Sequence, residues 1–211
     1  MSAIIIGSGS SIDKEIFYSE KINIEYVICA DGGLEKAEYL GLLPDVIIGD
    51  LDSVNTSVLK RYIEMNIEII EYPSEKNYTD MDLAIQYAVE KGYKEIILIG
   101  ASGSRIDHTM ANILLVELYY KKGIKIKIVD NNNIVQMVTG KMEIEYKKKY
   151  FVSIIPTSDT IEGITLDGFK YPLNNVNVKR GSTLCISNQI TEEKGIISLA
   201  KGSALVILSK D

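Results

Sequence analysis

Two aspartates that follow a short apolar run are the first residues in this sequence placed to do chemistry. Residues 46–48 read Val-Ile-Ile, and Gly49 separates them from Asp50 and, two positions later, Asp52. Such runs are typical of strands buried on both faces of a parallel sheet. If the chain stays extended, both carboxylates lie on one side and repel each other unless a cation lies between them. We therefore expect a divalent cation with oxygen ligands, most simply Mg²⁺, with a solvated helix-capping turn as the alternative.

Another acidic residue stands at the end of an expected strand. Asp31 follows the apolar run 26–30 and precedes Gly32 and Gly33. Paired glycines permit a positive φ and the close approach of a ligand to the backbone. The pattern therefore repeats that at Asp50, with an acid directly after an apolar run.

The segment 76–80 leads into an expected helix and contains Lys76, Thr79 and Asp80. Thr79 is a good N-cap, with Asp82 at the capping-box position. Asp80 then falls in the first helical turn, where complementing the helix dipole is its simplest role. Lys76 fits a phosphate contact as well as an ordinary surface position, and the sequence leaves both open.

Small residues at 100–104 lead into Arg105, Asp107 and His108, the single histidine of the chain. Arginine is suited to bidentate phosphate contact. Asp107 fits a helix cap, and an isolated histidine most often has a structural role. The helix that follows is expected to bury four apolar side chains: Met110, Ile113, Leu114 and Leu118.

The elements that must position these residues alternate between strand and helix up to about residue 130. Expected strands cover residues 3–6, 26–30, 46–48, 67–70, 96–99 and 124–129. This alternation predicts a mostly parallel α/β sheet, in which the carboxyl ends of the strands share one edge. The separate acids should therefore converge there. The glycine-serine loop 7–11 fits a phosphate loop or a plain turn.

Past Gly140 the helical spacing gives way to short β-rich runs punctuated by glycines. The expected strands are residues 142–146, 151–155, 161–166, 183–187, 196–199 and 204–208. We therefore predict an α/β N-terminal domain over residues 1–139 and a small all-β, sandwich- or barrel-like C-terminal domain over residues 140–211.

The bulk composition excludes several classes of protein. With 23 Lys+Arg against 29 Asp+Glu, the net charge is -6. The sequence has no obvious basic stripe of the kind that would predict a nucleic-acid partner. No apolar run is long enough to span a membrane. Cys29 and Cys185 lie far apart in the sequence and are expected to be buried thiols in a reducing compartment. We expect a cytoplasmic protein.

Taken in order, these motifs resemble those of the thiamine pyrophosphokinase family. The matching segments are residues 30–33, 49–53, 76, 79–80, 100–108, 112, 168, 171–173 and 187–188. The resemblance implies Mg²⁺-dependent transfer of pyrophosphate from ATP to the hydroxyl of thiamine, with release of AMP. It also implies an ATP-binding catalytic α/β domain, a thiamine-binding β domain and a homodimer.

The resemblance assigns roles to individual residues. Catalytic roles fall on Asp50, Asp52, Asp80 and Asp107, of which the first three also bind the metal. Nucleotide-binding roles fall on Asp31, Gly32, Gly33, Lys76, Arg105 and His108. Substrate-binding roles fall on Thr79, Asn112, Ser187 and Asn188. The chain departs from the family pattern at Asn77, Ser104 and Gln189, where Asp, Gly and Glu are common, and it has no Trp to stack on a thiamine ring.

Two other functions remain as alternatives. Residues 50–54 also resemble the D-x-D-x-[TV] motif of haloacid-dehalogenase-like phosphatases, which would make Asp50 a nucleophile. That motif usually lies near the N-terminus, and no convincing paired-acid motif follows late in the chain. A non-catalytic module that senses a nucleotide or thiamine is the second alternative, although binding alone needs fewer acids.

Overall fold

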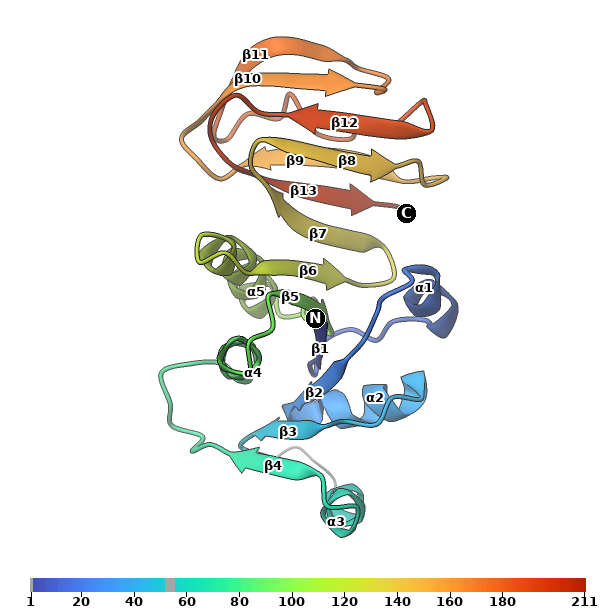
Figure 1. Ribbon diagram of the computed structural model, residues 1–211, viewed down its shortest axis with the longest axis vertical. Coiled ribbons are helices and arrows are strands. Elements are labelled where there is room, and N and C mark those ends of the chain that lie inside the picture. Colours follow the sequence, from blue (N-terminus) through green and yellow to red (C-terminus); the bar gives the residue numbers. More distant parts are fainter. Residues whose placement is uncertain (1, 52–55) are drawn as a thin grey trace. The chain divides into compact units, whose positions relative to one another are not determined.

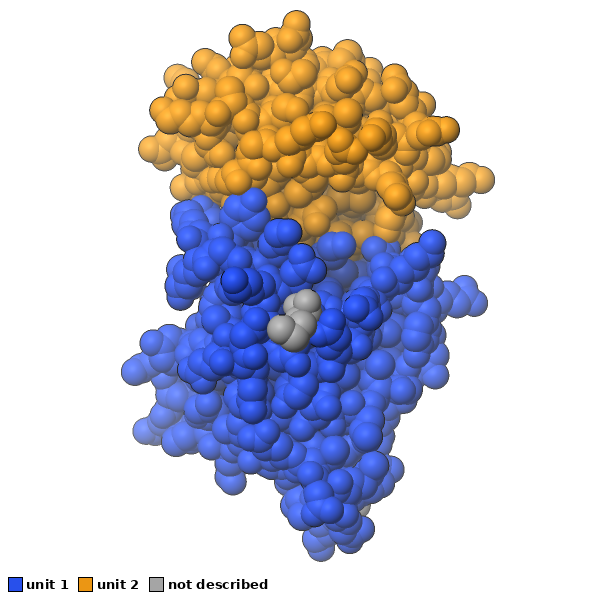
Figure 2. Space-filling model, viewed as in Figure 1, with its two compact units in different colours: residues 1–131 blue, residues 132–211 orange. Residues whose placement is uncertain are grey.

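The computed structural model describes residues 2–51 and 56–211, which form two compact units. The first unit comprises residues 1–131 and the second residues 132–211 (Figures 1 and 2). The division lies ahead of the expected one at residue 140. Strand β7 (Asn133–Val138) belongs to the second unit because it pairs antiparallel with β13 (Ala204–Ser209) near the end of the chain. The expected fold class, an α/β part followed by a small all-β part, is confirmed.

The first unit contains a parallel sheet with the strand order β4-β3-β2-β1-β5-β6 (Figure 1). Its strands are β1 (Ser2–Ile6), β2 (Tyr26–Ala30), β3 (Val46–Gly49), β4 (Glu68–Glu71), β5 (Glu95–Ile99) and β6 (Lys125–Val129). Every residue of β1 and β3 is buried. Both faces of these strands are therefore covered, which explains why their apolar runs are continuous rather than alternating.

The first unit also contains helices, some of which pack on strands of this sheet. The helices are α1 (Lys14–Ser19), the short 3₁₀ helix η1 (Asp31–Gly33), α2 (Leu34–Leu40), α3 (Thr56–Glu64), α4 (Asp80–Glu90) and α5 (Ile106–Tyr120). Helices α2 and α4 both pack on β1 and β2, and α5 packs on β6. Helix α2 is followed by Gly41, whose φ of 76° is the left-handed conformation that commonly ends a helix. Among the described helices, none has the length and apolar character needed to cross a membrane.

Helix α5 turns a different face inward from the one expected. Asn112, Val116 and Tyr119 are buried. The prediction that Met110, Leu114 and Leu118 are buried was wrong: together with Ile106 they are between 45% and 75% exposed. Apolar residues occupy most positions of this helix, so their spacing did not single out one face. We call Ile106, Met110, Leu114 and Leu118 the α5 apolar stripe.

The strand order changes direction at β1, with β2 on one side and β5 on the other. Ligands of open α/β sheets bind in the crevice at such a point, beyond the carboxyl ends of the strands. The loops after β1 and β5 run side by side there. The backbone N–H of Gly9 donates to the carbonyl of Gly100 at 2.9 Å, and that of Ser10 donates to the carbonyl of Ser102 at 2.7 Å. These bonds hold the two loops together.

The second unit consists of antiparallel sheets. One contains β7, β13 and β9 (Phe151–Pro156), with β13 between the other two. The other has the order β11-β10-β12-β8 and consists of β8 (Lys141–Glu145), β10 (Thr160–Asp167), β11 (Leu173–Lys179) and β12 (Lys194–Ser198) (Figure 1). The expected all-β character is confirmed.

Three of the expected details in this part of the chain differ. Strands β7 and β11 were not predicted, and β11 carries three asparagines, which strands disfavour. The strand expected at residues 183–187 is wrong, because this segment turns. The N–H of Ile186 donates to the carbonyl of Thr183 at 3.2 Å, and Ser187 has a φ of 57°.

Candidate active site

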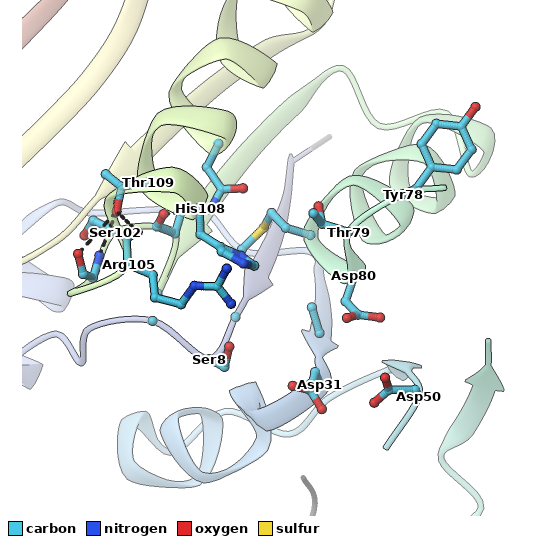
Figure 3. Close-up of a pocket in the computed structure, with 18 of the residues that line it drawn as sticks. Ser8, Asp31, Asp50, Tyr78, Thr79, Asp80, Ser102, Arg105, His108 and Thr109 are labelled. Atoms are coloured by element: carbon cyan, nitrogen blue, oxygen red, sulfur yellow. Dashed lines mark hydrogen bonds between the residues drawn. The ribbon is translucent and has the colours of Figure 1, made fainter. Parts of the chain in front are cut away.

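A cavity of about 570 Å³ opens at the carboxyl edge of the first unit's sheet (Figure 3). It is lined by the loops after β1, β2, β3 and β5, by the segment before α4, and by the first turns of α4 and α5. The expected convergence of separate motifs at one sheet edge is therefore present in the described part of the chain. It follows from parallel pairing, because each of these strands ends at the same edge.

Three carboxylates reach this cavity from three different elements. Asp31, Asp50 and Asp80 all line it, and their side chains lie around a common space (Figure 3). Asp31 has a φ of 48°, a left-handed conformation that is rare outside glycine and is often found at functional sites. The chain does not stay extended after Asp50, since Leu51 has a φ of 59°. Asp52 itself lies outside the described residues, so its expected place beside Asp50 stays a prediction from the sequence.

Two cationic side chains line the same cavity, and each pairs with an acid close to it in the sequence. The Lys76 Nζ donates to the Asp80 carboxylate at 2.5 Å. The Arg105 guanidinium donates to both carboxylate oxygens of Asp107, at 2.5 and 3.3 Å. This pair lowers the pKa of Asp107. Asp107 is exposed and is not among the residues that line the cavity, so its place here is that of a partner for Arg105.

The first turns of α4 and α5 face the cavity with Thr79 and His108 (Figure 3). The Thr79 Oγ1 accepts the backbone N–H of Asp82 at 3.2 Å, so the predicted N-cap is confirmed. Helix N-termini present unpaired backbone N–H groups and the positive end of the helix dipole. Both helices are thus oriented to attract an anion.

Gly32 and Gly33 are not among the residues that line this cavity. A Cβ on Gly33 would lie 1.9 Å from the carbonyl oxygen of Ile6, which no side chain could tolerate. Gly33 therefore allows η1 to pack on the end of β1.

The charges of the cavity suit a polyphosphate that arrives with a divalent cation. Among the described lining residues, three carboxylates face two cations and one histidine. No group of three or more His, Cys, Asp or Glu side chains in residues 2–51 and 56–211 is placed to hold a metal by itself. Mg²⁺ commonly takes one or two protein carboxylates and completes its shell with water and substrate phosphates. The donor set fits that kind of site.

Two family models match the chain. The model described as thiamin pyrophosphokinase, catalytic domain, matches residues 17–128. The model described as thiamin pyrophosphokinase, vitamin B1 binding domain, matches residues 141–203. The chain belongs to the thiamin pyrophosphokinase family.

Individual members of the family are similar over most of their length. The thiamine pyrophosphokinase of Bacillus subtilis (strain 168) is 40% identical over 173 residues, which is 81% of each chain. The crystal structure of thiamine pyrophosphokinase from Bacillus subtilis has a TM-score of 0.89 at 33% identity and full coverage of both chains. That of thiamin pyrophosphokinase from Geobacillus thermodenitrificans has a TM-score of 0.85 at 35% identity, covering 100% of this chain and 98% of that one.

Membership in this family confirms that the chain is an enzyme, a kinase of the transferase class. It favours the kinase over the phosphatase and the sensing module. The thiamin pyrophosphokinase catalytic model covers the cavity-lining segments from Ala30 through Asn112, whereas the loop after β1 precedes it.

In the second unit, the side chain of Asn188 is hydrogen-bonded to backbone groups. Its Oδ1 accepts the N–H groups of Tyr171 and Gln189, at 3.1 and 2.9 Å, and its Nδ2 donates to the carbonyl of Tyr171 at 2.8 Å. Asn188 is buried, and its hydrogen bonds to both backbone groups of Tyr171 hold that residue in place. Ser187 beside it is exposed in a left-handed conformation. Of the two residues expected to bind substrate here, Ser187 is the one that faces solvent.

In the thiamin pyrophosphokinase catalytic domain, side chains from outside the 100–105 loop hold it in place. Asn112 is buried, and its Nδ2 donates to the carbonyl of Ala101 at 2.7 Å. The Ser102 hydroxyl donates to Asp130 at 2.7 Å, and the Gly103 N–H donates to Thr109 at 3.1 Å. Thr109 and Asp130 were not predicted. A signal for Thr109 existed, since it stands four positions after Arg105, the N-cap of α5.

Replacing Asn112 with aspartate is expected to lower the free energy of unfolding by about 1–3 kcal/mol near neutral pH. The new carboxylate matches the amide in size but cannot donate to the Ala101 carbonyl. A protonated carboxyl can donate again, so the deficit should shrink as the pH falls toward about 4. Urea denaturation across this pH range measures both effects. A pH-independent deficit, or none, would contradict the assigned hydrogen bond.

Proposed function

We propose that this enzyme transfers the β,γ-pyrophosphoryl group of ATP to the hydroxyl of thiamine, with Mg²⁺, giving thiamine pyrophosphate and AMP. The observation that carries this proposal is the cavity at the switch point of the sheet, where Asp31, Asp50 and Asp80 meet Lys76 and Arg105. Phosphoryl-type transfer depends on positioning and charge neutralisation more than on a covalent nucleophile. Family membership supports thiamine as the acceptor.

We assign binding and positioning roles to individual residues of the cavity. Arg105, Lys76 and the N-termini of α4 and α5 bind the phosphates, while Asp31 and His108 position the nucleotide. Asp50 and Asp80 hold Mg²⁺, with Asp52 as a further ligand proposed from the sequence alone. When bound, Mg²⁺ supplies positive charge to the phosphate oxygens. Asp80, which lines the cavity, is the residue we assign to accept the proton of the thiamine hydroxyl, whereas Asp107, the other candidate from the sequence, pairs with Arg105 outside the lining.

We propose that the first unit, residues 1–131, is the ATP-binding catalytic domain and that the second unit, residues 132–211, is the thiamine-binding domain. We assign thiamine binding to Thr79, Asn112, Ser187 and Asn188. Asn112 and Asn188 act by holding backbone segments in place.

The two cysteines, Cys29 and Cys185, are free and buried, and burial raises the pKa of the Cys29 thiol to about 12. Inert thiols of this kind fit a reducing compartment, and we propose the cytoplasm.

Product analysis tests the reaction. Purified protein is incubated with ATP, Mg²⁺ and thiamine, and adenine nucleotides and thiamine phosphates are separated with and without thiamine. The proposal expects AMP in one-to-one ratio with thiamine pyrophosphate, and neither without Mg²⁺. ADP with thiamine monophosphate would move the attack to the γ-phosphate. Phosphate release without thiamine would favour the phosphatase.

We also propose that the enzyme is a homodimer that uses the α5 apolar stripe. The stripe exposes Ile106, Met110, Leu114 and Leu118 along one line of the helix, and contiguous apolar surface of this kind marks interaction sites. Leu114→Glu is expected to convert the dimer to monomer in sedimentation velocity. Tyr39→Glu, at a half-exposed residue of α2, serves as the control and should leave the dimer intact. A monomeric wild type, or a dimeric Leu114→Glu, would contradict this proposal.

A further inference from the structure

Lys76 is held in the cavity by two neighbours. Its Nζ lies 2.5 Å from the Asp80 carboxylate and 5.9 Å from the ring centroid of Tyr72. Its side chain is only 13% exposed, and that of Asp80 is 26% exposed. An ammonium placed between a carboxylate and an aromatic face, and largely removed from water, differs from a freely hydrated surface lysine. Lys76 therefore has a defined partner in the free protein.

That partner belongs to the acidic part of the cavity. Asp31 and Asp50 line the same space as Asp80 (Figure 3). Carboxylates gathered in one cavity repel one another, and a nearby positive charge offsets the repulsion. Among the described lining residues, the other cation is Arg105, which is bound to Asp107. The Lys76 ammonium therefore meets this group of acids at Asp80.

We propose that Lys76 is the internal counter-cation of Asp80: it pairs with this carboxylate in the metal-free protein and must release it when a divalent cation binds there. The inference rests on the proposed function in one respect, that Asp80 is a metal ligand. The lysine and the metal compete for one carboxylate. Once released, the ammonium is free to contact the phosphate that arrives with the metal, so that metal and nucleotide enter together rather than separately.

This competition predicts an effect on metal affinity that can be measured without a nucleotide. A divalent cation that binds alone must displace the ammonium without gaining any phosphate contact. Wild-type protein should therefore bind metal weakly by itself. Removing the lysine charge should make binding of the metal alone tighter, whereas removal of an ordinary binding residue would make it weaker or leave it unchanged.

The test is a titration of nucleotide-free protein with Mn²⁺, with free Mn²⁺ measured by electron paramagnetic resonance. Lys76→Met is expected to bind Mn²⁺ about tenfold more tightly than wild type, and Lys76→Arg, which keeps the charge, within about twofold of it. Lys91→Met is the matched control. Lys91 follows the other end of α4 and also lies over a tyrosine ring, that of Tyr87, so the same charge is removed away from the cavity.

A double-mutant cycle with Asp80→Asn separates this exchange from a general change in charge. In the Asp80→Asn background, Lys76→Met should alter Mn²⁺ affinity by less than about twofold. Unchanged or weaker binding by Lys76→Met alone would overturn the inference. So would equal tightening by Lys91→Met, or tightening that persists without Asp80. Circular dichroism checks that each variant is folded. Since neither ATP nor thiamine is present, failure here is distinct from failure of the proposed reaction.

Discussion

Asp50→Asn is expected to lower the rate of thiamine pyrophosphate formation by about 10³-fold while the protein stays folded. Asp50 follows β3 directly and lines the cavity together with Asp31 and Asp80. Asparagine has the same shape but no negative charge, so it cannot take over the proposed role of Asp50, which is to hold Mg²⁺ against the phosphates. The loss should appear mainly in kcat, because charge neutralisation matters most in the transition state.

Product formation at saturating ATP and thiamine, over a range of Mg²⁺ concentrations, measures this effect. Glu35→Gln provides the control, since it removes the same charge at an exposed position in the first turn of α2. Thermal unfolding should place both variants within a few degrees of the wild type. We extend the same expectation to Asp52→Asn from the sequence alone. Near-normal turnover in both aspartate variants would refute the metal-site assignment.

Gly9→Ala is expected to destabilise the fold by about 1–3 kcal/mol and to lower activity by at least about 10²-fold. A Cβ on Gly9 would lie 2.3 Å from the carbonyl oxygen of Ser102 and 2.4 Å from that of Gly100. Both neighbours are backbone atoms, so the two loops would have to separate. The hydrogen bond from Gly9 to Gly100 would be lost, and the cavity wall would move with it.

Gly103→Ala is the matched control for this prediction, in the partner loop. Its Cβ would meet nothing closer than 3.6 Å, which is an ordinary van der Waals contact. Its stability should stay within about 0.5 kcal/mol of the wild type. Urea denaturation and turnover are measured on both variants. If Gly9→Ala matched Gly103→Ala in both, the close approach of the two loops would be wrong.

The sheet and the position of the cavity followed from local patterns. Continuous apolar runs such as 46–48 predicted strands covered on both faces, and the alternation with helices predicted parallel pairing. Parallel pairing alone brings Asp31 and Asp50 to one edge, whatever the details of packing. The Thr79 cap was equally local, since it joins residues three positions apart.

Other assignments required contacts between distant parts of the chain. Asn112 reaches Ala101, and Gly33 packs on Ile6, so neither role could be derived from neighbouring residues. Asn188 looked like a ligand contact in its motif, but its amide is used by Tyr171 and Gln189. In each case a polar or small residue was visible in the sequence while its partner was not.

The sequence by itself determined the alternation of strands and helices in the first unit, the family, and the meeting of Asp31, Asp50 and Asp80 at one edge of the sheet. The tertiary structure decided which way individual groups face. It turned Met110 and Leu114 outward and gave Leu51 a left-handed conformation. It also paired Asp107 with Arg105, so that Asp107 does not line the cavity. The physical reason is one of scale. Local propensities amount to less than about 1 kcal/mol per residue, whereas the packing of a buried side chain contributes several.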